Sequence, residues 1–281
     1  MKKQLIQMSW PKSLFSLSLI LLMAIDGHSA YQIPDKSEVL VKFGKSFKKE
    51  LDPEEISVLN WNIYKGEKLT FKPWFLSLST GKDILIIQEM YLTTPIKTVS
   101  VATNKLHHMA TSFIDGDGVR TGVMTSSKVP AKRIEFQVSE KTEPVVNTPK
   151  VGLITEYPIK GTEKTLLVVN IHAINFVENK WFYKQIDQLF AKIDEHSGPV
   201  IFSGDFNTWN KNRYYMLDQY CRVRGFLQTN FFPDTRMTFN GNPLDHVIYS
   251  PDLEVQESKV HGHVDGSDHK PMTVKFRYIG N

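Results

Sequence analysis

From residue 56 onward, the chain alternates short apolar runs with polar loops. Several runs are continuously apolar, for example TLLVVNIH over 165–172. Continuous apolar runs of this length indicate strands that are buried on both faces, as in sheets covered by other layers. The pattern predicts strands at 56–63, 83–89, 119–126, 131–138, 150–157, 165–172, 199–205, 244–249, 253–260 and 271–278.

A helical spacing of apolar residues is clearest over 178–195. Gly198 follows this segment, where a helix is expected to have ended. Weaker patterns predict further helices at 73–80, 94–106 and 210–223. One face of the clearest helix would carry Phe182, Ile186, Leu189, Phe190 and Ile193.

The alternation of strands and helices continues from residue 56 to the C-terminus without a repeat or a linker. We therefore predict one α/β domain over 56–281. Two packed mixed sheets with helices outside them would cover so many apolar strands. A polar segment over 31–55 precedes this domain, and its pattern predicts no element.

The first 30 residues differ from the rest of the chain. Lys2, Lys3 and Lys12 precede an apolar run over 14–25, and small residues follow that run. This is the pattern of a secretory signal peptide over 1–30. The apolar run is shorter than the roughly 20 residues that a membrane-spanning helix needs. We therefore expect a secreted or periplasmic protein, with an N-terminal membrane anchor as the alternative.

Charge and cysteine content limit the function further. The 281 residues carry a formal net charge of +4, which falls to +2 without the first 30 residues. A net charge this close to zero does not indicate tight, non-specific binding of nucleic acid, which needs an excess of Lys and Arg. Cys221 is the only cysteine, so an intramolecular disulfide is excluded. A domain of this length needs no such cross-link.

Polar side chains gather at the ends of the predicted strands. The run PVIFSGDFNT over 199–208 ends in Asp205 and Asn207, which a continuing strand would point to the same side. Each such group alone has an ordinary explanation as a turn or cap residue. Together they are harder to dismiss, because polar groups beside apolar strands are costly unless satisfied. The other strand ends carry Asn62, Glu89, His172 with Asn175, Asp245, and Asp268 with His269.

The chemistry of this set is coherent. Carboxylate and amide oxygens suit Mg²⁺, Mn²⁺ or Ca²⁺ far better than zinc. His172 and His269 could act as acid and base near neutral pH, and Asp245 could orient one of them. A metal ion bound by oxygen ligands, together with two histidines, can catalyse the attack of water on a phosphodiester.

The same residues also carry a family resemblance. In order along the chain stand LNWNIYKG, LIIQEM, VVNIHAINF, IFSGDFNTWN, LDHVIYS and GSDHKP. They resemble the ordered motifs of the endonuclease/exonuclease/phosphatase superfamily of DNase I-like enzymes, from about residue 56 to residue 277. NIHAINF and HSGPVIFSGDFNTW particularly resemble bacterial YafD-like members. The resemblance implies a four-layer α/β/β/α sandwich, with the site of a metal-dependent phosphoric ester hydrolase at one end of the paired sheets.

The resemblance also implies a metal site and a general base. Glu89 resembles the main metal ligand, with Asn62 and Asp268 nearby. His269 resembles the general base that activates water, and Asp245 the residue that orients it. The metal is expected to be Mg²⁺ or Mn²⁺, with Ca²⁺ as a further candidate, and the resemblance leaves one or two ions open.

Further residues are implied to contact the phosphate. Asp205 and Asn207 resemble the pair that holds the phosphate and assists proton transfer or metal binding. His172 matches the histidine of the DNase I and sphingomyelinase branches, and abasic-site endonucleases have no histidine there. Arg236 and Asn175 are candidate substrate-binding residues, since an arginine near a phosphate can bind it with two hydrogen bonds.

We therefore expect a phosphodiesterase that hydrolyses nucleic acid. The alternatives are a phospholipid phosphodiesterase of the sphingomyelinase type, which would bind a lipid headgroup, and a phosphomonoesterase. A binding module that has lost activity is a further alternative, since fold alone does not imply function. Such a module would be expected to lack Glu89, His172 or His269, and all three are present. We expect a monomer, and no obligate protein partner is evident.

Overall fold

The structure is a computed structural model that describes residues 31–144 and 146–280. The signal peptide that the sequence predicts over 1–30 lies outside the described residues. Among the helices of the described part, none is both long and apolar enough to cross a membrane.

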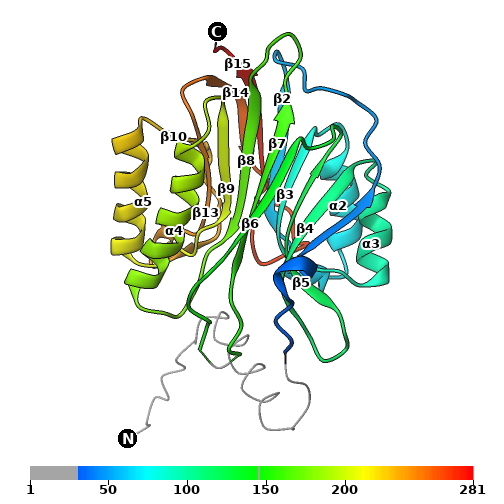
Figure 1. Ribbon diagram of the computed structural model, residues 1–281, viewed down its shortest axis with the longest axis vertical. Helices are drawn as coiled ribbons and strands as arrows, with labels where there is room; N and C mark the ends of the chain where they lie inside the picture. The colour runs from blue at the N-terminus through cyan, green and yellow to red at the C-terminus, as the bar shows by residue number, and fades with distance from the viewer. Residues whose placement is uncertain (1–30, 145, 281) are drawn as a thin grey trace, which may run out of the picture.

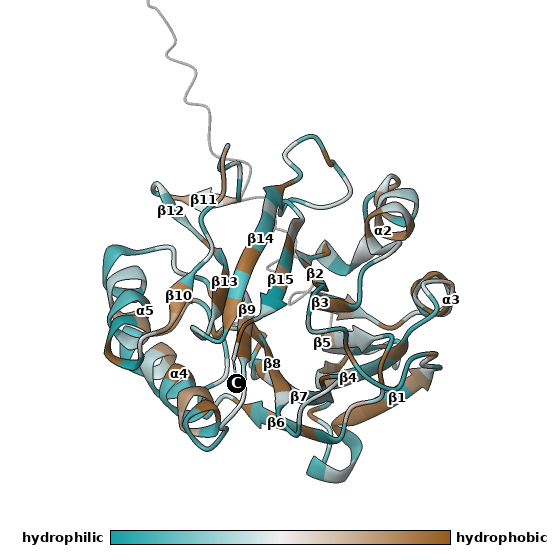
Figure 2. Cartoon of the chain, turned by 90° about the horizontal axis from the view of Figure 1, so that it is seen from above, coloured by the Kyte–Doolittle hydropathy of each residue, from teal (hydrophilic) through white to brown (hydrophobic). Residues whose placement is uncertain are grey.

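Two mixed β-sheets pack face to face, and helices cover the outer face of each sheet (Figures 1 and 2). One pair of helices is α2 (Phe71–Ser79) and α3 (Thr94–Val101), and the other is α4 (Asn179–Asp194) and α5 (Lys211–Arg224). The predicted α/β/β/α sandwich is confirmed. Short 3₁₀ helices, η1 (Lys36–Glu38) and η2 (Tyr64–Gly66), lie in the connections.

The first sheet has seven strands. In spatial order they are β1 (Leu40–Gly44), β4 (Leu106–Ile114), β5 (Arg120–Ser127), β3 (Ile84–Tyr91), β2 (Ile56–Asn62), β15 (Met272–Tyr278) and β14 (Leu253–Val260).

The second sheet has six strands. In spatial order they are β10 (Leu227–Gln228), β13 (Asp245–Tyr249), β9 (Val200–Asp205), β8 (Thr165–His172), β7 (Val151–Pro158) and β6 (Arg133–Val138). A small hairpin of β11 (Thr238–Phe239) and β12 (Asn242–Pro243) stands apart from both sheets.

All the predicted strands are present, and the structure adds β1, β4 and the short strands β10 to β12. The helix predicted over 94–106 was too long. It ends at Val101, and the chain then turns through Asn104, whose φ is +55°. The following run over 106–114 mixes histidine, serine and threonine with apolar residues, so it lacks a continuous apolar signal. Residues 31–55, for which the sequence predicted no element, contribute β1, which pairs with β4.

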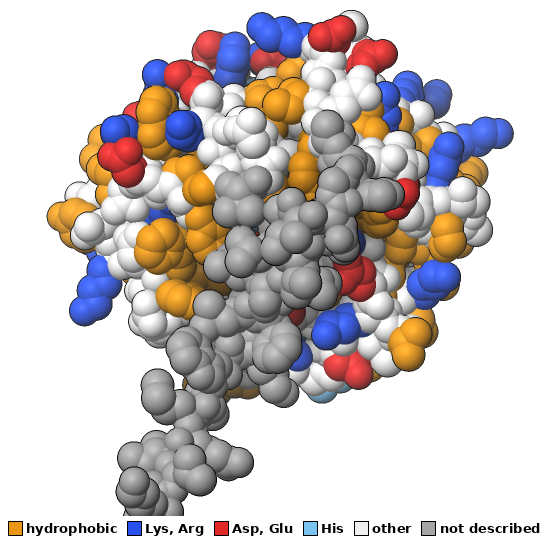
Figure 3. Space-filling model, turned by 90° about the horizontal axis from the view of Figure 1, so that it is seen from below, with side chains coloured by type: hydrophobic (Ala, Val, Ile, Leu, Met, Phe, Trp, Pro, Cys, Tyr) orange, Lys and Arg blue, Asp and Glu red, His pale blue; other side chains and the backbone are white. Residues whose placement is uncertain are grey.

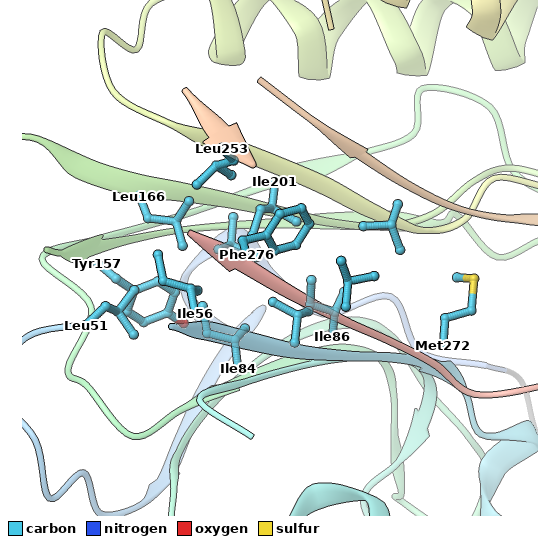
Figure 4. Close-up of a cluster of buried hydrophobic side chains, with 14 of the residues drawn as sticks. Leu51, Ile56, Ile84, Ile86, Tyr157, Leu166, Ile201, Leu253, Met272 and Phe276 are labelled. Atoms are coloured by element: carbon cyan, nitrogen blue, oxygen red, sulfur yellow. The ribbon is translucent and has the colours of Figure 1, made fainter. Parts of the chain in front are cut away.

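The core lies between the two sheets. Side chains of β2 and β3 meet those of β8 and β9 there, with Phe276 of β15 among them (Figure 4). Fully burying such an aliphatic or aromatic side chain stabilises the fold by about 1.5–3 kcal/mol. The labelled members of this cluster are Leu51, Ile56, Ile84, Ile86, Tyr157, Leu166, Ile201, Leu253, Met272 and Phe276.

The strand directions collect the polar strand ends at one edge of the sandwich. β2 runs parallel to β3, and β8 runs parallel to β9, so the carboxyl ends of each pair coincide. β13 and β15 run antiparallel to these strands and begin at the same edge. Asp245 faces Asp205 across the ladder, and Met272 faces Asn60.

A buried polar network joins the two sheets beneath this edge. Nδ2 of Asn170 in β8 donates to the carbonyl oxygens of Ile87 at 3.1 Å and Met124 at 3.0 Å, both in the other sheet. Nε2 of Gln88 donates to Oδ1 of Asn170 at 2.8 Å and to Oδ1 of Asn60 at 3.1 Å. These three polar side chains are at most 1% exposed. Asn170 therefore ties the second sheet to the segment of β3 that precedes Glu89.

Replacing Asn170 with alanine is expected to lower the free energy of unfolding by about 2–4 kcal/mol, because each buried partner left unsatisfied costs roughly 1–3 kcal/mol. Urea denaturation followed by tryptophan fluorescence measures the change. Gln256→Ala is the control, since Gln256 is exposed on β14. A loss below 0.5 kcal/mol in Asn170→Ala would show that the network does not stabilise the sheet packing.

Candidate active site

Asp205 ends β9 and lies at the centre of the polar cluster. Its Oδ2 accepts a hydrogen bond from Nδ2 of Asn62 at 3.0 Å. The same oxygen lies 3.7 Å from Nε2 of His172 and 3.8 Å from Nε2 of His269. Only 2% of Asp205 is exposed. One carboxylate oxygen therefore faces both imidazole rings, one from the end of β8 and the other from the loop before β15.

His269 and Asp245 form a hydrogen-bonded pair. Nδ1 of His269 lies 2.7 Å from Oδ2 of Asp245, and both residues are buried. This contact places the proton on Nδ1 and leaves Nε2 to face Asp205. The pair therefore has the geometry of a general base held by a carboxylate.

The loop before β15 fixes the position of His269. Oγ of Ser267 donates to the carbonyl oxygen of Asn62 at 2.7 Å, and Nε1 of Trp61 donates to the carbonyl oxygen of His269 at 3.1 Å. Asp268 is exposed beside them, and its Oδ1 accepts from the backbone N–H of His269 at 3.1 Å. Trp61, at 0% exposure, thus anchors the loop from beneath.

A β-bulge re-aims Glu89 at the end of β3. The register of β3 against β5 shifts between Ile87 and Met90, and the φ of Glu89 is +52°. Residues other than glycine rarely adopt such a φ, and strained backbone of this kind clusters at functional sites. Oε1 of Glu89 accepts from Nδ2 of Asn62 at 3.2 Å. The Asn62 amide thus bridges the carboxylates of Glu89 and Asp205.

The amide of Asn62 has a defined orientation. Its Oδ1 accepts from the backbone N–H of Tyr64 at 3.1 Å, so its NH₂ group faces the two carboxylates. In this arrangement Asn62 orients Glu89 and Asp205 and does not offer its oxygen between them. The contact with Tyr64 could not be read from the sequence, because it depends on the turn that follows β2.

The end of β9 turns sharply. Gly204 has a φ of +151°, and a Cβ built on it would lie 2.0 Å from the carbonyl oxygen of Ile171, so no larger residue fits there. Asn207, with a φ of +50°, lies beyond the strand. Its backbone N–H donates to Oδ1 of Asp205 at 2.9 Å, and its Nδ2 donates to the carbonyl oxygen of Ala173 at 2.9 Å. A turn, and not strand alternation, therefore relates Asn207 to Asp205.

Burial and neighbouring charges separate the pKa values of the site. Burial raises the pKa of Asp205 to about 7, although His269 opposes this shift. Burial alone lowers the pKa of His269, but the carboxylates of Asp245 and Asp205 raise it well above its usual value. Burial, followed by the charge of Lys150, lowers the pKa of His172 well below its usual value. Near neutral pH, His172 is thus neutral, and His269 is in its positively charged imidazolium form when no cation is bound.

Within the part of the chain that the structure describes, the carboxylates of the site form no ion pair with Lys or Arg. The ion-pair contacts of Asp205 and Asp245 are with histidines only. Within the described residues, no Lys or Arg forms an ion pair with Glu89 or Asp268. Glu89 and Asp268 both raise the pKa of Tyr64, after burial and Glu67, which puts both carboxylates near the Tyr64 hydroxyl. Such a surplus of hard, negative oxygens favours a divalent cation.

Two groups of side chains could hold that cation. Asp205, Asp245 and His269 each offer an atom, and these atoms lie within 4.8 Å of one another. In that group Nδ1 of His269 is already engaged with Asp245, whereas Oδ1 of Asp245 is buried and has no hydrogen-bond partner among the described residues. The other group is the set predicted from the sequence, Glu89 and Asp268 with Asn62. Asp205 lies between the two groups through its contact with Asn62.

Arg236 and Asn175 lie in loops beside this cluster. Nη2 of Arg236 pairs with Asp234 at 2.7 Å, and its Nη1 donates to the carbonyl oxygen of Asp245 at 2.9 Å. Oδ1 of Asn175 accepts from the N–H of Phe176 at 2.9 Å. The guanidinium group of Arg236 is therefore engaged within the protein and supports Asp245, and the amide oxygen of Asn175 is engaged as well.

The sequence analysis did not identify one basic side chain near the site, that of Lys150. Lys150 precedes β7, pairs with Glu143 at 3.3 Å and lies close enough to lower the pKa of His172. Glu143 in turn accepts from the N–H of Asn175 at 2.9 Å. Lys150 follows a polar loop in the sequence and carries no motif, so no signal in the sequence identifies it.

Comparison with known proteins places this geometry in a family. Residues 59–269 match the Endonuclease/Exonuclease/phosphatase family. A UPF0294 protein of Vibrio cholerae is 34% identical over 255 residues, which cover 89% of this chain and 83% of the relative.

Solved structures share the fold. An endonuclease/exonuclease/phosphatase family protein from Leptotrichia buccalis superposes with a TM-score of 0.64 at 15% identity, covering 79% of this chain and 100% of that one. A mannosyl-6-phosphatase of Bacteroides thetaiotaomicron superposes with a TM-score of 0.61 at 15% identity, covering 79% of this chain and 99% of that one. The chain therefore belongs to the endonuclease/exonuclease/phosphatase family of phosphoric ester hydrolases, in its UPF0294, YafD-like branch, as its motifs predicted.

Proposed function

We propose that this protein is a divalent-metal-dependent phosphodiesterase, with nucleic acid as its leading substrate. The observation that carries the proposal is the Asp245–His269 pair, whose free Nε2 points at Asp205 beside the Glu89–Asn62 contact. A base, a proton donor and a set of oxygen ligands thus meet at one edge of the sheets.

The site fits Mg²⁺ or Mn²⁺ because its carboxylates are hard ligands that pair with no Lys or Arg of the described residues. When bound, the cation would neutralise phosphate charge and polarise a phosphate oxygen. Glu89 is the carboxylate best placed to hold it, and Asp268 lies at the rim. A cation beside Asp205 would also lower the pKa of His269, since a nearby positive charge disfavours the imidazolium form.

The residues can then divide the proton transfers of hydrolysis. Nε2 of His269 accepts a proton from the attacking water, while Asp245 stabilises the imidazolium that forms. As the bond between phosphorus and the new oxygen forms, the bond to the leaving oxygen breaks. Asp205, with a pKa of about 7, can hold a proton near neutral pH and deliver it to that oxygen. Neutral His172 can donate a hydrogen bond to the phosphate.

The histidines and the charge of the surface bear on the substrate class. The pair of histidines resembles the nuclease and sphingomyelinase branches and not the abasic-site endonucleases. On the part of the face in Figure 3 that is not covered in grey, Lys and Arg are interspersed with Asp and Glu. Because the formal net charge is only +4 over 281 residues, a nucleic-acid substrate would be bound through few phosphates, with a shallow dependence on salt.

A substrate panel tests the proposal. Purified protein with Mg²⁺ or Mn²⁺ is offered bis(p-nitrophenyl) phosphate, plasmid DNA, RNA, sphingomyelin and phosphoinositides. A phosphomonoester, p-nitrophenyl phosphate, is added because one structural neighbour is a mannosyl-6-phosphatase. Cleavage of DNA or RNA is expected. Cleavage of lipid alone, or of the monoester alone, would replace nucleic acid as the substrate class.

We also propose export, on the basis of the basic and apolar pattern of residues 1–30. N-terminal sequencing of the protein recovered from periplasm or medium is expected to begin near Tyr31, because a signal peptidase would remove the preceding segment. Replacing Leu21 in the apolar run with arginine should retain the protein inside the cell. A recovered chain that begins at Met1 would favour the membrane anchor.

A further inference from the structure

A buried arginine holds two loops of the site together. Arg213 lies in the first turn of α5 and is 0% exposed. Its Nη1 donates to the carbonyl oxygens of Ile174 at 2.8 Å and Asn207 at 3.3 Å, and its Nη2 donates to that of Val177 at 3.1 Å. Ile174 and Val177 belong to the loop that follows β8, whereas Asn207 belongs to the loop that follows β9. One guanidinium group therefore joins both loops.

The surroundings hold the guanidinium rigidly. Its central carbon lies 4.7 Å from the ring centre of Phe182 and 5.0 Å from that of Trp209, and its Nε donates to Oδ1 of Asn179 at 3.2 Å. All its side-chain hydrogen bonds end on carbonyl or amide oxygens, and none ends on a carboxylate. Burial lowers the pKa of Arg213 to about 10, so it still carries its charge near neutral pH.

Stability alone does not account for this residue. Burying a charge without an opposite charge is costly, and well-packed apolar residues of similar volume are often at least as stabilising. The guanidinium instead satisfies irregular backbone that has no other partner of this kind. Phe176 and Asn207 in these loops both have a φ near +50°, at +53° and +50°. The buried guanidinium therefore serves to stabilise the conformation of these two loops.

The shape of the second loop determines how Asp205 is oriented. The backbone N–H of Asn207 donates to Oδ1 of Asp205, which leaves Oδ2 to face His172 and His269. The carbonyl group of the same residue accepts from Arg213. We propose that Arg213 is a positioning residue that fixes the turn at Asn207 and thereby orients the Asp205 carboxylate toward the two histidines. Its kinetic consequence rests on the proposed function.

Two substitutions test the proposal. Arg213→Lys keeps the charge but cannot reach three carbonyl groups at once, and Arg213→Met keeps the bulk without donors. Both are expected to lower kcat for bis(p-nitrophenyl) phosphate by about 10- to 100-fold with KM changed less than threefold, since small misplacements of reacting groups have effects of this size. Rates are measured well below the unfolding midpoint of each variant.

Arg224→Met is the matched control. Arg224 lies on the same helix, 4.8 Å from the ring centre of Phe190, and pairs with Asp194 away from both loops. This variant should keep the wild-type kcat. If it loses as much kcat as the Arg213 variants, or if these keep kcat within twofold, the positioning role is wrong.

Hydrogen exchange gives a readout that needs no activity. The backbone amides of Asn207 and Ile174, which donate to Asp205 and Gln185, should exchange at least 10-fold faster in Arg213→Lys and Arg213→Met than in the wild type. Unchanged exchange of these amides would overturn the positioning role of Arg213, whatever the substrate panel shows. A wild type that hydrolyses no substrate of the panel would overturn the proposed function and not the positioning role. If neither Arg213 variant folds, Asn179→Ala removes the acceptor that Nε of Arg213 shares with Nδ2 of Asn210. Faster exchange of the same amides in Asn179→Ala then supports the proposal, and unchanged exchange overturns it.

Discussion

Replacing His269 with alanine is expected to lower kcat for bis(p-nitrophenyl) phosphate by about 10²–10⁴-fold, the usual contribution of a general base. Nε2 of His269 is the imidazole nitrogen left free by the contact with Asp245, and it faces Asp205, beside which the attacking water would lie. Initial rates at saturating Mg²⁺, followed by release of p-nitrophenolate, measure the change.

The loss must be separated from unfolding, because Asp245 is left buried without its partner when His269 is removed. Circular dichroism and the unfolding midpoint of each variant establish that it is folded. His261→Ala is the matched control, since His261 begins the same loop and hydrogen-bonds Thr273 at 2.9 Å away from the cluster. Less than a fivefold loss in folded His269→Ala would rule out His269 as the base.

Asp245→Asn tests how the pair works. Asparagine can donate its NH₂ group to Nδ1 and so favour the tautomer with its proton on Nε2, which cannot accept a proton from water. We therefore expect Asp245→Asn to lose at least 10²-fold in kcat with KM nearly unchanged. The double variant Asp245→Asn/His269→Ala should be no slower than His269→Ala, because the two residues act as one unit.

The sequence predicted the strand ends of the site because each of them follows a strong local signal. Asp205 and His172 close continuous apolar runs, and polar groups in such places stand out in one dimension. The sandwich followed from the number of these runs and from the family motifs. The pairing of Asp205 with Asp245 was not predicted, because it depends on the register of β13 against β9.

The backbone conformations and hydrogen bonds that orient the site residues could not be predicted from the sequence, because they depend on contacts between residues far apart along the chain. The bulge at Glu89 arises from pairing with β5, and nothing in LIIQEM marks a φ of +52°. Asn170 appears as one polar residue in an apolar strand, and its partners lie 46 to 83 residues away. Arg213 lies in a helix with a weak apolar face, where an arginine is ordinarily exposed.

Removing the metal is expected to abolish hydrolysis, and Glu89→Gln should approach the same result. Excess EDTA should eliminate the activity of the wild type, and added Mn²⁺ should restore it. Glu89→Gln keeps the size of the side chain and removes its charge, so the Mn²⁺ concentration for half-maximal activity should rise by at least 10-fold. Full activity in excess EDTA would rule out metal dependence. Glu67→Gln, an exposed carboxylate in the neighbouring loop, is the control and should bind Mn²⁺ normally.

Direct Mn²⁺ binding, followed by electron paramagnetic resonance, then decides which group of side chains holds the cation. If Glu89 and Asp268 hold it, Glu89→Gln should lose Mn²⁺ while His269→Ala retains it, because His269 would act only on water. If the cation lies among Asp205, Asp245 and His269, the reverse should hold. The first result is expected, since Nδ1 of His269 is already engaged with Asp245 while Glu89 has only the amide of Asn62 against its carboxylate.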